Sequence, residues 1–225
     1  MATEPQSNPN PQDKMIVSYL TIRKAVGYLG IAFPIVLAIG IKVIGHCTCF
    51  KDSLSSYYYT VMSSYFSGTL CAIGLFLFTY RGYDRTDQWV SNIGAVFALS
   101  VVFFPTDIGG SCLSCNVFTR AADSVADTIH FTTAGLFFVT MAGMSFFLFT
   151  KSDGQPTPQK LKRNKVYKTC AYVMVVSMAL IPALKIPGIP DWFFSWKPQF
   201  WFEAFVLWAF GVSWLVKGEG ILQDK

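Results

Sequence analysis

Charged residues are scarce in this chain. Only 14% of its 225 residues are Asp, Glu, Lys or Arg, whereas a soluble domain carries about 25%. Six stretches lack charge altogether, namely residues 25–41, 53–80, 88–106, 131–150, 169–184 and 204–216. A membrane span needs about 20 mostly apolar residues, and each stretch reaches that length with its edges. We therefore predict an all-α polytopic membrane protein, a single bundle of six transmembrane helices.

Histidine is scarcer still, and acidic residues avoid the helix interiors. The chain has two histidines, His46 and His130, which are too few for the usual ligand set of a catalytic zinc. No acid or histidine falls in the inner half of a predicted helix, so a proton relay across the bilayer lacks carriers. These absences argue against haem, a histidine zinc centre and a proton-coupled transporter. We expect no cofactor and no metal.

Lys and Arg are unevenly distributed between alternate loops. With the N-terminus inside, 13 of the 18 Lys and Arg residues fall on inner segments and the other 5 on outer ones. The positive-inside rule then places both termini in the cytoplasm. The most basic segment, KLKRNKVYK at 160–168, is expected to face anionic lipid headgroups rather than nucleic acid.

The chain divides into three parts. Residues 1–24, which open with MATEPQSNPNPQDK, are predicted to be a disordered cytoplasmic tail and helix lead-in, without the basic start of a secretory signal. Residues 25–216 form the transmembrane domain, and residues 217–225 a short cytoplasmic tail. Helices are expected at about 25–44, 65–80, 89–104, 127–150, 167–184 and 200–216. The proline- and aromatic-rich segment 182–199 suits the membrane interface.

Four cysteines fall in the two predicted outer loops. Cys47 and Cys49 form a CxC pair in the first loop, and Cys112 and Cys115 form a CxxC pair in the second. Four thiolates resemble a zinc site, and free thiols are a third alternative. An oxidising compartment favours disulfides, and a bond within CxC is strained, so we expect disulfides that join the two loops.

Polar residues gather at the outer ends of the predicted helices. The stretch FFPTDIGGSCLSCNVFTRAADSVADTIHFTTAGLFF (103–138) brings several of them between two apolar runs. We predict that Asp107, Asp127, His130 and Glu203 converge in one water-accessible pocket with Tyr57 at its wall, because lone charges facing lipid are costly. The alternative is purely structural: helix caps and a histidine that ties helices together.

Three short motifs carry a family resemblance. SLSSYYYT before the second helix, FPTD at the end of the third and DTIHFTTAGLFF at the start of the fourth resemble a bacterial six-helix membrane family of unknown function. That family is itself similar to the FRAG/DRAM/Sfk membrane proteins. The resemblance covers most of residues 25–216 and maps the family's aspartate to Asp107, its histidine to His130 and its serines to Ser53, Ser55 and Ser56. It implies lipid handling in a bacterial inner (plasma) membrane.

Three functions remain open on the sequence. We expect a protein that binds or handles membrane lipids through an outer-face polar pocket. The first alternative is a lipid-modifying hydrolase or acyltransferase, in which Asp127 orients His130 as general base and Ser55 is the nucleophile. A separation of about 3–4 Å between Ser55 or Ser56 and His130 would favour this enzyme. The second alternative is a small channel or carrier.

Overall fold

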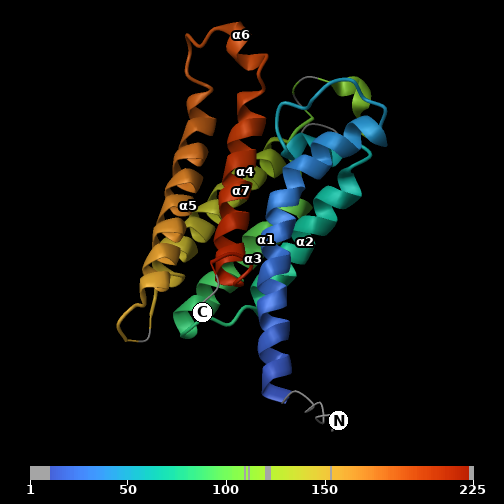
Figure 1. Cartoon of the computed structure of the whole chain (residues 1–225). Coiled ribbons are helices and arrows are strands. Elements are labelled where there is room, and N and C mark those ends of the chain that lie inside the picture. Colours follow the sequence, from blue (N-terminus) through green and yellow to red (C-terminus); the bar gives the residue numbers. More distant parts are fainter. Residues whose placement is uncertain (1–10, 109, 111, 120–122, 153, 223–225) are drawn as a thin grey trace, which may run out of the picture.

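The computed structural model describes residues 11–108, 110, 112–119, 123–152 and 154–222, except for the side chains of 11–18. This part of the chain consists of helices and loops and has no strand. Six long helices lie side by side in one bundle (Figure 1). They are α1 (Pro11–Val43), α2 (Ser63–Thr79), α3 (Arg85–Phe103), α4 (Ser124–Gly143), α5 (Pro158–Ala183) and α7 (Pro198–Lys217).

Four of these helices are long and apolar enough to cross a membrane. The four segments are residues 19–43 of α1, 124–148 of α4 with its continuation, 158–183 of α5 and 198–217 of α7. Helix α2 is apolar but has 17 residues, and the first turn of α3 carries the charged residue Asp87. The all-helical fold and the apolar helices agree with the predicted class of integral membrane protein.

Two helices begin earlier than the apolar runs indicate. Helix α1 starts at Pro11, so residues 11–24, expected to be tail and lead-in, are already helical, while residues 1–10 lie outside the described part. Helix α5 starts at Pro158 rather than near 167, because the Thr157 side chain accepts a hydrogen bond from the Lys160 N–H and Pro158 fits the first helical position. Hydropathy marks only the apolar part of each helix.

The remaining helical segments are short. They are η1 (Ser55–Tyr59), η2 (Leu113–Cys115), the π-helical turn η3 (Met144–Leu148) that continues α4, and α6 (Asp191–Phe194). Helix α6 falls within the segment predicted for the membrane interface. It carries exposed tryptophans on and beside it, with Trp192 66% and Trp196 72% exposed.

Helices α1 and α7 pack closely through glycine. A Cβ added to Gly211 would lie 2.7 Å from the carbonyl oxygen of Gly27, so no other residue fits there without moving the backbone. Small residues allow such close approach between membrane helices. This contact fixes α7 against the first helix.

The connecting loops divide between the two ends of the bundle. The described residues of 44–62, 104–119 and 184–197 lie at one end, which we call the loop end (Figure 1). The start of α1 and the end of α7 lie at the opposite end, together with the loop at 80–84 and the described residues of 149–157 (Figure 1). The four loop cysteines (Cys47, Cys49, Cys112 and Cys115), the start of α4 with His130 and the start of α7 all belong to the loop end.

Candidate functional site

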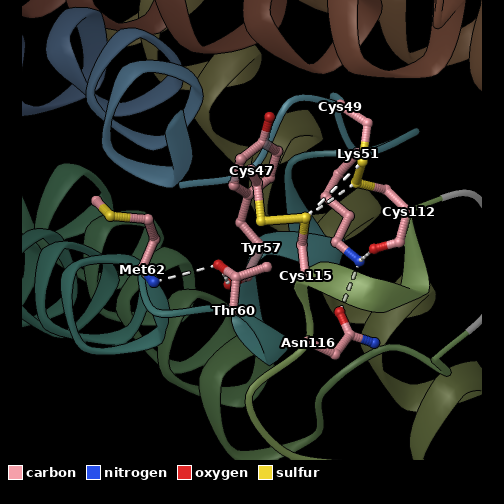
Figure 2. Close-up of a disulfide and its surroundings, with 9 residues drawn as sticks. All are labelled: Cys47, Cys49, Lys51, Tyr57, Thr60, Met62, Cys112, Cys115 and Asn116. Atoms are coloured by element: carbon pink, nitrogen blue, oxygen red, sulfur yellow. Dashed lines mark hydrogen bonds between the residues drawn. A yellow bond between two sulfur atoms is a disulfide. The ribbon is translucent and has the colours of Figure 1, made fainter. Parts of the chain in front are cut away.

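Four cysteines join the two long loops of the loop end. The sulfur atoms of Cys47 and Cys115, and those of Cys49 and Cys112, lie at disulfide-bonding distance (Figure 2). The Cα–Cα separation is 6.0 Å in both pairs, which is usual for a disulfide. Each pair links a residue of the first loop to a residue of the second, as the sequence predicted.

A buried lysine reinforces this connection. Lys51 is only 2% exposed, and its Nζ donates to the Cys112 carbonyl at 2.8 Å and to Asn116 Oδ1 at 2.6 Å (Figure 2). Burial lowers the pKa of Lys51, while the neighbouring Asp52 opposes this shift. The positive charge is satisfied by two oxygen atoms of the opposite loop.

Tyr59 forms the third connection between the loops. Its hydroxyl donates to the Thr106 carbonyl at 2.5 Å, and its own carbonyl accepts from the Val117 N–H at 2.9 Å. The first loop is therefore held to the second at Cys47, Cys49, Lys51 and Tyr59, which positions the residues of η1 relative to the end of α3.

The sulfur atoms also form a compact cluster. Cys49, Cys112 and Cys115 offer three sulfur atoms within 4.8 Å of one another. Thiolates at this spacing suit a soft metal such as zinc. The paired arrangement uses the same sulfur atoms, so the disulfide and metal forms of this cluster exclude each other.

The centre of the site is a contact between η1 and α4. Ser55 Oγ lies 2.9 Å from His130 Nε2, and His130 Nδ1 lies 2.8 Å from the carbonyl oxygen of Phe104. The histidine is 1% exposed and lies in the second turn of α4. The separation of Ser55 and His130 meets the distance expected for a serine and its general base.

The Phe104 carbonyl selects the tautomer of His130. A carbonyl oxygen only accepts hydrogen bonds, so the Nδ1 atom carries the proton. In the neutral imidazole Nε2 then has the free lone pair, which can accept the proton of Ser55. The chain thus lines up a hydroxyl, an imidazole and an orienting acceptor, which is the order of groups in a serine hydrolase.

A small apolar cavity opens beside this serine. Its volume is about 80 Å³, and Ser55, His130 and Glu203 share its lining. The other walls are apolar: Phe33, Leu54, Phe66, Leu70, Ala98, Val101, Phe131, Ala134, Phe137, Phe138, Met178, Ile181 and Leu207. One water needs about 10–15 Å³, so the cavity admits a chemical group rather than a whole lipid.

Glu203 fixes the backbone just before the serine. Its Oε2 atom accepts from the Leu54 N–H at 2.6 Å, and its Oε1 atom accepts from Gln199 Nε2 at 2.9 Å. The carboxylate therefore ties Leu54, the residue just before η1, to α7. In this arrangement Glu203 is a positioning residue for Ser55.

The two aspartates predicted for the pocket, Asp107 and Asp127, do not line the cavity. Asp127 Oδ1 accepts from the Thr106 hydroxyl at 2.9 Å and from the Asp107 N–H at 2.8 Å. Asp107 is exposed, and its carboxylate accepts from the Ile108 N–H at 2.8 Å. Asp127 thus holds the loop after α3 to the first turn of α4, and the Phe104 carbonyl occupies the orienting position that the sequence offered to Asp127.

Tyr57 lies behind the site in the apolar core. It is fully buried, and its ring centroid is 6.1 Å from that of Phe200. Among the described residues its hydroxyl has no hydrogen-bond partner, and burial raises the pKa of Tyr57 to about 12. It packs η1 against α7 and is not among the residues that line the cavity.

Two groups of the site carry no sequence signal. The orienting acceptor is the backbone carbonyl of Phe104, and the group that Glu203 binds is the backbone N–H of Leu54. Every non-proline residue has both groups, so only the fold reveals which of them is used. The available sequence signals were the serine-rich segment and the ionisable residues near helix ends, such as His130 and Glu203.

No protein-family model, curated protein or solved structure matches this chain. The geometry of the loop end is therefore the basis on which a function can be argued.

Proposed function

We propose that this protein is a membrane-embedded serine hydrolase or acyltransferase that acts on lipid esters. The observation that carries the proposal is the Ser55–His130–Phe104 arrangement, with Ser55 Oγ 2.9 Å from His130 Nε2. The apolar cavity beside Ser55 supports a substrate with hydrocarbon character. The resemblance to a bacterial six-helix membrane family, itself similar to the FRAG/DRAM/Sfk membrane proteins, adds an expectation of lipid handling.

The proposed reaction uses only groups of this chain and the substrate. Ser55 Oγ attacks the ester carbonyl while its proton passes to His130 Nε2, and a C–O bond forms. The bond to the leaving alcohol then breaks, and that oxygen takes the proton back from His130 Nε2. Water or an acceptor alcohol attacks the acyl-serine with His130 again as the base, which releases the acyl group and restores Ser55.

The positioning of Ser55 and His130 supports this chemistry. Ser55 follows a residue held by Glu203 and lies in a loop that the cysteine pairs, Lys51 and Tyr59 connect to the second loop. Nucleophile and base are therefore held at reacting distance before a substrate arrives. Preorganisation of this kind lowers the entropic part of a reaction barrier.

The membrane topology is part of the proposal. Six crossings would place both termini and the basic loops in the cytoplasm of a bacterial inner membrane, and the loop end on the oxidising side. Helix α2 with 17 residues reaches about 26 Å at about 1.5 Å per residue, close to a hydrocarbon core of about 30 Å. Helix α2 packs against α1 and α3, and α3 packs against α4.

An epitope inserted at a loop glycine would test this topology. Gly154 and Gly188 both lie in turns with positive φ, and a side chain at either would meet no atom within 4 Å. Antibody added to intact spheroplasts should reach an epitope at Gly188 but not one at Gly154 until the membrane is opened. The reverse accessibility, or access to both, would contradict the proposed orientation, in which Gly154 lies inside and Gly188 outside.

A fluorophosphonate probe tests the chemistry, because it bonds covalently to an activated serine. The purified wild-type protein should be labelled, and Ser55→Ala should abolish the label. Ser56→Ala is the matched control, because the Ser56 hydroxyl binds Ser53 at 2.8 Å rather than His130. His130→Gln should slow labelling about a hundredfold or more through loss of the base. Equal labelling of the wild type and Ser55→Ala would refute the assignment.

Lipid binding without chemistry is the second candidate. The apolar lining of the cavity favours it, because such a wall suits part of an acyl chain. In that case the purified protein would retain lipid but would not react with the fluorophosphonate. Thermal unfolding curves of each variant would separate loss of reactivity from loss of the fold.

A further inference from the structure

A second and much larger cavity adjoins the small one. Its volume is about 780 Å³, within the usual range of about 300–1,000 Å³ for ligand pockets. Phe131, Met178 and Ile181 line both cavities, so they form the partition between them. The larger cavity, which we call the chamber, lies between α4, the end of α5, the α6 segment and the start of α7.

Four charged side chains line the chamber in balanced number: Lys185, Lys197, Asp52 and Asp191. Lys197 Nζ forms a salt bridge with Asp52 Oδ1 at 2.5 Å. Among the described residues Lys185 and Asp191 have no salt bridge, and the Lys185 ammonium lies 5.4 Å from the ring centroid of Phe131. The chamber thus offers one cation and one anion to a ligand.

The partition brings this charged chamber to the reactive serine. Phe131 belongs to the wall of the small cavity and also lies beneath the Lys185 ammonium. Gln199 lines the chamber and donates to Glu203, which lines the small cavity. A ligand in the chamber would therefore have its polar end at the lysine and aspartate and a neighbouring group within reach of Ser55.

The position of α6 indicates the depth of the chamber. Trp192 and Trp196 are exposed beside Asp191 and Lys197, and such tryptophans are enriched at the level of lipid headgroups. In the topology proposed above, the chamber lies at the outer interface. Its charged lining and the apolar cavity behind it match the two ends of a lipid molecule.

We propose that the chamber binds the headgroup of a zwitterionic phospholipid with a primary ammonium group, such as phosphatidylethanolamine. This inference deepens the proposed function and rests on it for the role of Ser55. Lys185 binds the phosphate, Asp191 binds the ammonium, and an ester of the same lipid enters the cavity at Ser55. An anionic headgroup would leave Asp191 opposed by like charge. A quaternary ammonium would instead favour an aromatic cage.

Competition between headgroups tests the inference. The Ser55→Ala protein, which cannot turn over an ester under the proposed mechanism, is incubated with an equimolar mixture of phosphatidylethanolamine, phosphatidylcholine and phosphatidylglycerol in detergent micelles. Retained lipid is then counted by native mass spectrometry. We expect phosphatidylethanolamine to be enriched about threefold over phosphatidylglycerol, the size of effect that a partly exposed ion pair gives.

Charge variants assign the two ends of the headgroup. Asp191→Asn should abolish the preference for phosphatidylethanolamine over phosphatidylglycerol, and Asp191→Lys should reverse it. Lys185→Gln should lower retention of all three phospholipids. Lys165→Gln is the matched control, because it removes the same charge from an exposed position near the start of α5, at the other end of the helix that Lys185 follows.

The outcomes separate this inference from the proposed function. Equal retention of phosphatidylethanolamine and phosphatidylglycerol, or an unchanged ratio in Asp191→Asn, overturns the headgroup assignment even if Ser55 reacts with a fluorophosphonate. Headgroup preference without a reactive Ser55 supports the chamber and refutes the chemistry. The fluorophosphonate label on the chamber variants with Ser55 intact reports that the neighbouring site still folds.

Discussion

We predict that removing both cysteine pairs lowers the free energy of unfolding by more than the sum of the two single-pair removals. They connect residues 68 and 63 positions apart, and both close nearly the same loop. A single cross-link over such a loop restricts the unfolded chain by about 4 kcal/mol. The second link then closes only the short segments between the pairs, about five residues, which adds about 2 kcal/mol.

Removal of one pair should therefore cost about 2 kcal/mol, whereas removal of both should cost about 6 kcal/mol. For a chain of this size each kcal/mol lowers Tm by about 3 °C. We expect Tm to fall by about 6 °C in Cys47→Ser with Cys115→Ser, by about the same in Cys49→Ser with Cys112→Ser, and by about 18 °C in the fourfold variant.

Each pair has to be removed as a pair. Cys115 Sγ lies 3.3 Å from Cys112 Sγ and 3.8 Å from Cys49 Sγ, so a single substitution would leave a thiolate free to attack the remaining disulfide. The assay is thermal unfolding in detergent without reductant, together with the rate of fluorophosphonate labelling at Ser55. An unchanged Tm in the fourfold variant, or simple additivity of the two pairs, would refute the reasoning.

Three further perturbations have directions set by the structure. Gly211→Ala should destabilise the protein by about 1–3 kcal/mol, because its Cβ meets the α1 backbone at 2.7 Å; Gly68→Ala meets nothing within 4 Å and should be neutral or stabilising in the same unfolding assay. Lys51→Met should destabilise the protein by about 1–3 kcal/mol, because it leaves two hydrogen-bond acceptors unpaired. A wild-type rate of disulfide reduction in this variant would contradict the role of Lys51 in holding the two loops together. Hydrogen bonding to Lys151 lowers the pKa of Asp84 below 3.8, and hydrogen bonding to Asp84 raises the pKa of Lys151 above 10.5. The pair's contribution to stability is thus present between those values and is lost as pH falls below 3.8 or rises above 10.5. The Tm difference between wild type and Asp84→Asn should therefore vanish at low pH and shrink at high pH, where the Asp84 carboxylate still accepts from the Asp87 N–H at the start of α3.

The apolar parts of the helices could be predicted because a lipid environment requires apolar side chains over a fixed length. An apolar run of the right length is required wherever a helix meets lipid, whatever the fold around it. The first turns of α1 and α5 were missed because they are polar, and hydropathy detects only the apolar part of a helix. The π-helical turn at Met144–Leu148 has no such compositional requirement and was not predicted.

The site could be predicted only in part. His130 and Glu203 attracted attention because an ionisable group in an apolar helix needs a partner. Ser55 was one serine among several, and it lies 75 residues from His130, so its selection depends on how η1 is held against α4. Asp127 was offered as the orienting group because it lies one turn from His130. In the structure it binds the Thr106 hydroxyl instead, since the loop after α3 passes over the start of α4.

The order in which the site residues occur along the chain has a consequence for biosynthesis. Ser55 follows the first long helix, His130 belongs to the fourth and Glu203 to the last. In the proposed six-crossing topology, a ribosome-bound chain therefore holds its serine in an incomplete site until the final helix has entered the bilayer. The paired cysteines are 68 and 63 residues apart. In that topology they cannot meet until α2 and α3, which lie between them, have both been inserted. The reactive group would thus be kept inactive during insertion, when it is surrounded by the lipids on which the finished protein is proposed to act.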